Sequence, residues 1–154
     1  MIYSVYITSR SGSLLYQKDF KTVNSPITRQ KSNDYLVIAS SLHGVHAIAS
    51  KITPPDAVHN HERSKLLANS NRTGLREIAT AQFKIFINQT VTGVKIILFV
   101  SRDVDETRFA LMYDKIYQYY CDYVLKNPFY ELEMPIRCHL FDEQLNSVVA
   151  ASNV

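Results

Sequence analysis

Lys95-Ile96-Ile97-Leu98-Phe99-Val100-Ser101 is the stretch that decides the fold, because residues 96–100 form an uninterrupted apolar run. In an extended chain such a run places apolar side chains on both faces, which is typical of a central strand covered on both sides. The beginning of the chain, residues 2–9, has the same character and is rich in Tyr, Val and Ile. Pairing these two segments predicts the centre of an antiparallel sheet.

Three further strands are predicted around this centre. Residues 14–19 follow the first strand across a turn at Arg10-Ser11-Gly12-Ser13, in which Gly12 can take a positive φ. Residues 75–80 form a short strand of mixed character. In the next strand Phe83, Ile85 and Ile87 alternate with more polar residues, and a turn at 90–93 precedes the central stretch. With the two most apolar strands in the middle, the expected order is 2-1-5-4-3.

Helical periodicity predicts three helices. The first begins near Ser32 or Asn33 and ends at Thr53-Pro54-Pro55, and its buried face is expected to consist of Tyr35, Ile38, Leu42, Val45, Ala49 and Ile52. The second begins at a capping box between Asp103 and Glu106 and ends at Asn127-Pro128, and its buried stripe is Phe109, Tyr113, Ile116, Tyr120 and Val124. After an extended segment, 129–136, the last helix starts at about Arg137 and buries Phe141, Leu145 and Val148.

The predicted fold class is α/β (α+β), a single-domain α/β/α sandwich over residues 1–154. One helix covers one face of the five-stranded sheet and two helices cover the other. A chain of 154 residues with 46% hydrophobic and 20% charged residues suits one globular core. Residues 20–32 and 56–74 are expected to be loops.

Composition excludes several classes of function. The net charge is +3, and lysines and arginines are scattered among acidic residues, so nucleic-acid binding is not expected. Two distant cysteines, Cys121 and Cys138, predict no disulfide and fit a reducing compartment. The first residues lack a signal-peptide pattern, and no apolar run approaches the length of a membrane span. We therefore expect a cytoplasmic protein whose membrane association is indirect.

The polar residues and glycines of the chain do not predict a chemical site. His59, His61 and Glu62 resemble zinc ligands, but they lie in a patternless loop that lacks the rigid support of a catalytic zinc site, so solvated residues are predicted instead. His43 and His46 lie off the predicted buried face and are expected to face solvent or a partner. The glycines form no phosphate-binding loop. No metal, cofactor or catalytic residue is predicted.

The segment 125–138, Leu-Lys-Asn-Pro-Phe-Tyr-Glu-Leu-Glu-Met-Pro-Ile-Arg-Cys, carries a resemblance to a known family. Its signature residues are Asn127, Pro128, Phe129, Tyr130, Met134, Pro135, Ile136 and Arg137. The chain resembles the synbindin family of small subunits of the transport protein particle (TRAPP) complex, and the similarity extends to residues 2–17, 89–95, 115–117 and 139–145. The family's fold is longin-like (profilin-like). Larger members insert a module where this chain has only residues 20–32.

The resemblance implies a non-catalytic core subunit that acts in transport from the endoplasmic reticulum to the Golgi. It implies other small TRAPP subunits as partners and a Rab-type GTPase bound through the assembled complex, which catalyses guanine-nucleotide exchange. The implied location is peripheral, at endoplasmic reticulum and cis-Golgi membranes. Two alternatives are a small longin subunit of another adaptor or coat complex, and a small metal-dependent hydrolase that uses His59, His61 and Glu62.

Two partner-binding surfaces are predicted from the residues themselves. On the first helix, Val37, Ser41, Gly44 and Ile48 form a second stripe about a quarter turn from the buried face, where small residues allow close approach of another helix. The third strand lies at a sheet edge and offers Leu75, Arg76, Ile78 and Thr80 to a neighbouring chain. The five tyrosines of the second helix suit either core packing or an interface.

Overall fold

The computed structural model describes residues 1–20, 32–56 and 74–153. Its five strands form one antiparallel sheet in the order β2-β1-β5-β4-β3, as predicted. The strands are β1 (Ile2–Thr8), β2 (Leu14–Asp19), β3 (Glu77–Ala79), β4 (Phe83–Gln89) and β5 (Lys95–Ser101). The two central strands pair in register from Ser4 opposite Phe99 to Thr8 opposite Lys95.

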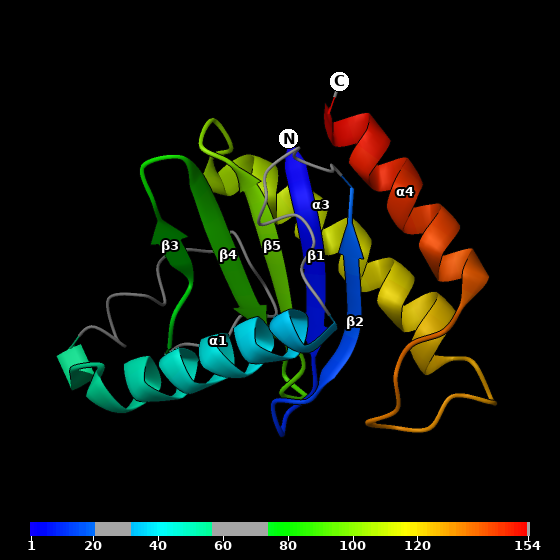
Figure 1. Ribbon diagram of the computed structural model, residues 1–154, viewed down its shortest axis with the longest axis horizontal. Helices are drawn as coiled ribbons and strands as arrows, with labels where there is room; N and C mark the ends of the chain where they lie inside the picture. The colour runs from blue at the N-terminus through cyan, green and yellow to red at the C-terminus, as the bar shows by residue number, and fades with distance from the viewer. Residues whose placement is uncertain (21–31, 57–73, 154) are drawn as a thin grey trace.

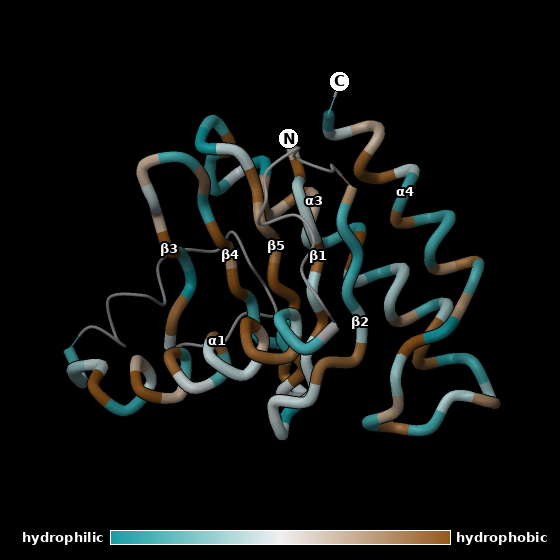
Figure 2. The backbone as a smooth tube through the Cα atoms, in the orientation of Figure 1, coloured by the Kyte–Doolittle hydropathy of each residue, from teal (hydrophilic) through white to brown (hydrophobic). Residues whose placement is uncertain are grey.

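The helices form two layers on opposite faces of this sheet, which confirms the predicted sandwich (Figure 1). On one face α1 (Ser32–Ile52) crosses the strands. The other face carries α3 (Glu106–Tyr119), the π-helix η2 (Tyr120–Leu125) and α4 (His139–Asn153). In Figure 2 the hydrophobic colour follows β4 and β5 between the two layers.

The larger part of the core lies between the sheet and the pair α3–α4. The Phe86 ring of β4 stacks on Phe109 of α3 with centroids 4.4 Å apart, and Phe141 of α4 meets Tyr16 of β2 edge to face. The Tyr16 hydroxyl also donates a hydrogen bond to the Asp142 carboxylate, which ties α4 to an edge strand. The predicted buried residues of these helices are all buried: Phe109, Tyr113, Ile116, Tyr120, Val124, Phe141, Leu145 and Val148.

The second predicted helix ends in a wider π turn that periodicity did not reveal. In η2 the Lys126 amide bonds to the Cys121 carbonyl, five residues earlier, at 3.2 Å. Residues spaced by four drift about 40° around an α-helix with each step, and a wider turn reverses that drift. The π turn therefore keeps Ile116, Tyr120 and Val124 buried on the same side.

Three predicted boundaries were wrong. The second helix has no capping box between Asp103 and Glu106, because it begins at Glu106 and Asp105 is its N-cap; the Asp105 carboxylate accepts from the Arg108 amide at 2.9 Å. Asp103 instead accepts a bond from Ser101 in the preceding turn. The third strand is only Glu77–Ala79, shorter than the predicted 75–80, and the last helix begins at His139.

The buried face of α1 is rotated from the predicted one. Leu42 is buried as expected, but Val45 and Ile52 are exposed, and Ala39 and His46 are buried in their place. The rotation brings polar side chains of the helix against the sheet. The sequence pattern missed this because the apolar periodicity of α1 fits two overlapping faces equally well, and only contacts with the sheet distinguish them.

Candidate functional site

Two histidines fix the position of α1 on the sheet. His43 Nδ1 accepts a hydrogen bond from the ammonium group of Lys95, with the two nitrogens 3.1 Å apart. Lys95 is the first residue of β5, and it is only 3% exposed. The His43 ring also fills the space beside Gly12, where an added Cβ would lie 2.8 Å from Cδ2 of the ring. His43 thus joins α1 to the β1–β2 turn and to the central strand.

His46, one turn further along α1, contacts residues nearer the β3 edge of the same face. Its Nε2 lies 2.8 Å from Oε1 of Gln89 at the end of β4, and its Nδ1 lies 3.3 Å from the carbonyl of Leu75. Gly74 makes room for the ring, since a Cβ there would lie 2.5 Å from His46 Cε1. The prediction that both histidines face solvent or a partner was wrong, because a positive-φ glycine provides a slot for each ring.

The contact between His43 and Lys95 makes stability depend on pH. Burial, followed by the charge of Lys95, lowers the pKa of His43 from its ordinary value of 6.5. At pH values between the lowered pKa of His43 in the folded chain and 6.5, the unfolded chain binds more protons than the folded chain. The free energy of unfolding therefore falls as pH drops below 6.5. Burial likewise lowers the pKa of Lys95.

We expect the variant His43→Gln to show a smaller loss of stability on acidification than the native chain. Urea unfolding of both proteins at about pH 7.5 and about pH 5 measures the difference. The free energy of unfolding should fall more in the native chain, because only there does His43 take up a proton on unfolding. Equal losses in the two proteins would contradict a depressed pKa for His43.

The face of α1 that points away from the sheet is apolar and unpartnered in the described part of the chain. Val37 and Ile48 are each 62% exposed, Ser41 is exposed, and a Cβ added to Gly44 would meet nothing within 4 Å. Because the buried face is rotated, these residues lie roughly half a turn from Leu42 and His46 rather than a quarter turn. We call Val37, Ser41, Gly44 and Ile48 the outer face of α1.

The strand β3 forms an edge of the sheet close to this helix. It pairs only with β4 among the described residues, through Glu77–Phe86, Ile78–Ile85 and Ala79–Lys84. No described residue pairs with its other side, where an edge strand offers backbone N–H and C=O groups to a partner. Figure 1 shows the C-terminal half of α1 extending past β3 at the same end of the sheet.

The four residues predicted at this edge do not all lie on it. Ile78 is in β3, but its side chain packs with Leu75 in the core under α1. The Arg76 carbonyl accepts from the Ile87 amide at 2.8 Å, and the Thr80 hydroxyl donates to the Phe83 carbonyl in the β3–β4 turn. The Arg76 guanidinium lies 3.9 Å from the Glu106 carboxylate, so the side chains of Arg76 and Thr80 contact the rest of the fold. The backbone of Glu77–Ala79 is the part that we expect a partner to use.

The opposite edge, at β2, is occupied by the chain's own signature segment. We call residues 126–137, which connect η2 to α4, the strap. The Ile136 amide donates to the Leu15 carbonyl of β2 at 2.8 Å, and the Ser11 hydroxyl donates to the Glu133 carboxylate at 2.9 Å. The strap contains all eight signature residues: Asn127, Pro128, Phe129, Tyr130, Met134, Pro135, Ile136 and Arg137. Only Ile136 among them is buried.

The described residues contain no group of three or more His, Cys, Asp or Glu side chains that can hold a metal ion. His59, His61 and Glu62 lie outside the described residues. Cys121 and Cys138 are free and half-buried against the core. Tyr113 and Tyr120 are core residues, while Tyr117, Tyr119 and Tyr123 pack partly buried against them. No described helix is both long enough and apolar enough to cross a bilayer.

The strand order and the two helical layers define a longin-like α/β/α sandwich, the class that the sequence predicts. Comparison with known families identifies it further. The chain belongs to the Sybindin-like family, whose model matches residues 2–152. The resemblance drawn from the signature segment is thereby confirmed.

Relatives in several organisms carry related names. A "Trafficking protein particle complex subunit 4" of Dictyostelium discoideum is 36% identical over 148 residues, which cover 96% of each chain. The human protein of that name is 38% identical over 117 residues, 76% of this chain but only 46% of the human one. A "Trafficking protein particle complex subunit 1" of Dictyostelium discoideum is 26% identical over 95% of this chain and 92% of its own length. All three relatives are named as subunits of a trafficking protein particle complex.

Proposed function

We propose that this chain is a core subunit of a trafficking protein particle complex and that it binds a second longin-like subunit through the outer face of α1 and the edge strand β3. The full-length match to a relative named as subunit 4 supports the assignment to such a complex. The observation that carries the proposed mode of binding is the exposure of Val37 and Ile48 on a helix whose other side is fixed to the sheet.

The two surfaces are suited to one partner because the C-terminal half of α1, which carries Gly44 and Ile48 of the outer face, lies beside β3 at the same end of the sheet (Figure 1). An edge strand extends a neighbour's sheet through backbone hydrogen bonds, while small residues such as Ser41 and Gly44 permit close contact between helices. A stable interface buries about 1,200–2,000 Å² in total, more than a three-residue strand provides. The outer face of α1 is therefore a necessary part of the interface.

The complex, in this proposal, acts at endoplasmic reticulum and Golgi membranes as an exchange factor for a Rab-type GTPase. Exchange requires a surface that binds the nucleotide-free GTPase more tightly than the loaded one, because only a difference in affinity shifts the equilibrium. Nucleotide exchange does not require any residue of this chain to make or break a covalent bond. The chain contributes contacts and holds neighbouring subunits in position, and membrane association comes through the assembly.

The purified chain alone should show no nucleotide exchange. Release of a fluorescent guanine nucleotide from the Rab-type GTPase of the same organism should remain at the uncatalysed rate when this chain is added alone. The rate should rise only after the other small subunits of the particle are mixed with it. A strong acceleration by the isolated chain would overturn the proposal, and so would an assembled particle that forms and exchanges equally well without it.

A further inference from the structure

The tip of the strap exposes large apolar side chains that the sheet-edge interface does not use. Phe129 is 92% exposed and Leu132 is 78% exposed, with Met134 beside them. Figure 1 places the strap beyond β2, at the opposite end of the sheet from β3. A partner bound to α1 and β3 would therefore leave these side chains in solvent.

The strap holds these side chains in a fixed arrangement. The Asn127 carboxamide oxygen accepts from the Phe129 amide at 3.0 Å, and the Tyr130 amide donates to the Asn127 carbonyl at 3.2 Å. The Tyr130 hydroxyl donates to the Met134 carbonyl at 2.9 Å. Burial raises the pKa of Tyr130 above its ordinary value. Because these bonds already order the strap, binding a partner would cause a smaller loss of conformational entropy.

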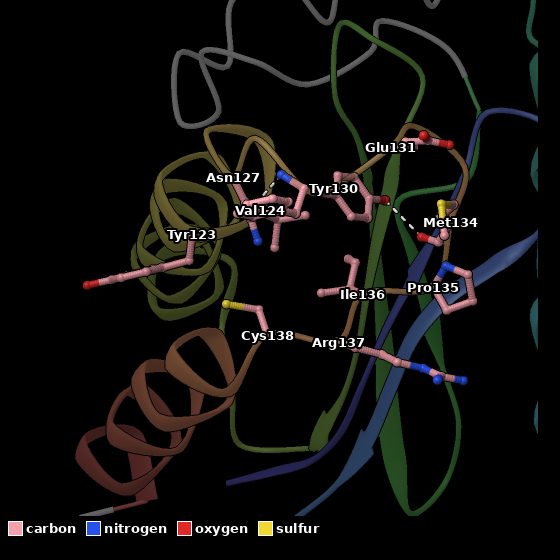
Figure 3. A pocket seen from close by; sticks show the side chains of 11 residues that line it. Tyr123, Val124, Asn127, Tyr130, Glu131, Met134, Pro135, Ile136, Arg137 and Cys138 are labelled. Atoms are coloured by element: carbon pink, nitrogen blue, oxygen red, sulfur yellow. Dashed lines mark hydrogen bonds between the residues drawn. The ribbon is translucent and has the colours of Figure 1, made fainter.

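A cavity of about 220 Å³ lies between the strap and η2. Figure 3 shows Val124, Tyr130, Ile136 and Cys138 around it, while the Arg137 side chain points away. Its walls are mainly apolar, and Glu131 lines it as well. Such a cavity accepts an apolar side chain from another protein, in the manner of a pocket at the centre of an interface.

The charges of the strap specify the rest of the partner. Leu132 stands between Glu131 and Glu133, and neither carboxylate has an ion-pair partner in the part of the chain that the structure describes. Of the two basic residues of the strap, Lys126 is neutralised by Asp122, with the charged atoms 3.1 Å apart, and the exposed Arg137 points away from the cavity (Figure 3). Two carboxylates around an apolar tip attract lysine or arginine, and they are repelled by an anionic lipid surface. The charges therefore favour a protein over a membrane.

We propose that the strap is a second protein-binding surface, and that its partner is a segment of another subunit that places an apolar side chain in the cavity and lysine or arginine opposite Glu131 and Glu133. The proposal rests on the proposed function, because it treats the chain as part of an assembly. It makes the chain a link between two neighbours at opposite ends of its sheet.

Site-specific photo-crosslinking tests this surface in the assembled complex. Leu132 is replaced with the photoreactive residue p-benzoylphenylalanine in cells, and the complex is purified and irradiated. In a matched control variant, Leu111, which is 63% exposed on α3, is replaced with the same photoreactive residue. The Leu132 probe should crosslink to one peptide of another subunit that contains an apolar residue flanked by lysine or arginine, and the Leu111 probe should not reach that peptide.

The double variant Glu131→Lys/Glu133→Lys should lower the yield of this crosslink at least about tenfold, because it places like charges at the contact. An intact complex in which Leu132 gives no crosslink above the Leu111 control would overturn the strap proposal and leave the proposed function standing. A crosslinked peptide without basic residues would also overturn it. Binding to phosphatidylcholine–phosphatidylserine vesicles that is lost in Phe129→Ser/Leu132→Ser would show a membrane contact instead. Absence of any other subunit from the purified material would contradict the proposed function itself.

Discussion

Gly44→Trp is expected to abolish binding of the neighbouring longin-like subunit while leaving the isolated chain folded. A Cβ added at Gly44 would meet no atom within 4 Å, so we expect the indole to project into solvent in the free subunit. In the complex it would occupy the space that a partner helix needs between Val37 and Ile48. We expect at least an about 100-fold loss of affinity, since blocking the centre of an interface costs several kcal/mol.

The measurement is titration of each purified variant with the partner subunit, together with urea unfolding of the variant alone. Leu111→Trp is the matched control, because it adds the same ring to an exposed position on the other side of the sheet. That control should bind as the native chain does. Unchanged affinity in Gly44→Trp would refute the assignment of the outer face of α1 as an interface.

Gly74→Ala is expected to have the largest effect on stability. Gly74 has a φ of +104°, and an added Cβ would lie 2.5 Å from His46 Cε1 and 2.7 Å from the Ser50 hydroxyl oxygen. The backbone conformation costs an L-residue about 1–2 kcal/mol. Forcing His46 out of its slot adds a further loss of about 1–3 kcal/mol, as in an overpacked core. We therefore expect the free energy of unfolding to fall by about 3 kcal/mol.

Gly44→Ala, a substitution within α1, provides the opposite result. That glycine lies in the interior of α1 with open space around it, so alanine should raise the free energy of unfolding by about 1 kcal/mol through helix propensity alone. Urea unfolding of the two variants measures both changes. If Gly74→Ala stayed within about 0.5 kcal/mol of the native chain, the slot for His46 would not contribute to the docking of α1.

The strand order of the sheet was predictable because several short segments of the sequence indicate it independently. The two apolar stretches at 2–9 and 95–101 can be buried on both sides only at the centre, and the order of the remaining strands follows from short turns. The buried stripes of α3 and α4 were predictable for a similar reason, since large apolar residues recur there at spacings of three and four. The predicted order 2-1-5-4-3 is the observed one.

Features that depend on contacts between distant residues were not predictable. The slots of His43 and His46 are formed by Gly12 and Gly74, which are far from α1 in sequence. The same holds for Leu15, whose carbonyl binds the strap. In the strap the sequence identified the family, but its exposed Phe129 and the cavity beside η2 emerge only from the folded chain.

The asymmetry of the sheet has a consequence for how large an assembly can grow. A sheet with two open borders can add copies in both directions and extend into filaments. Here the Leu15 carbonyl at the β2 edge accepts a hydrogen bond from the strap, and β3 at the other edge is only three residues long. We therefore expect little strand-by-strand polymerisation, so that assemblies of this chain form particles of fixed stoichiometry rather than fibres.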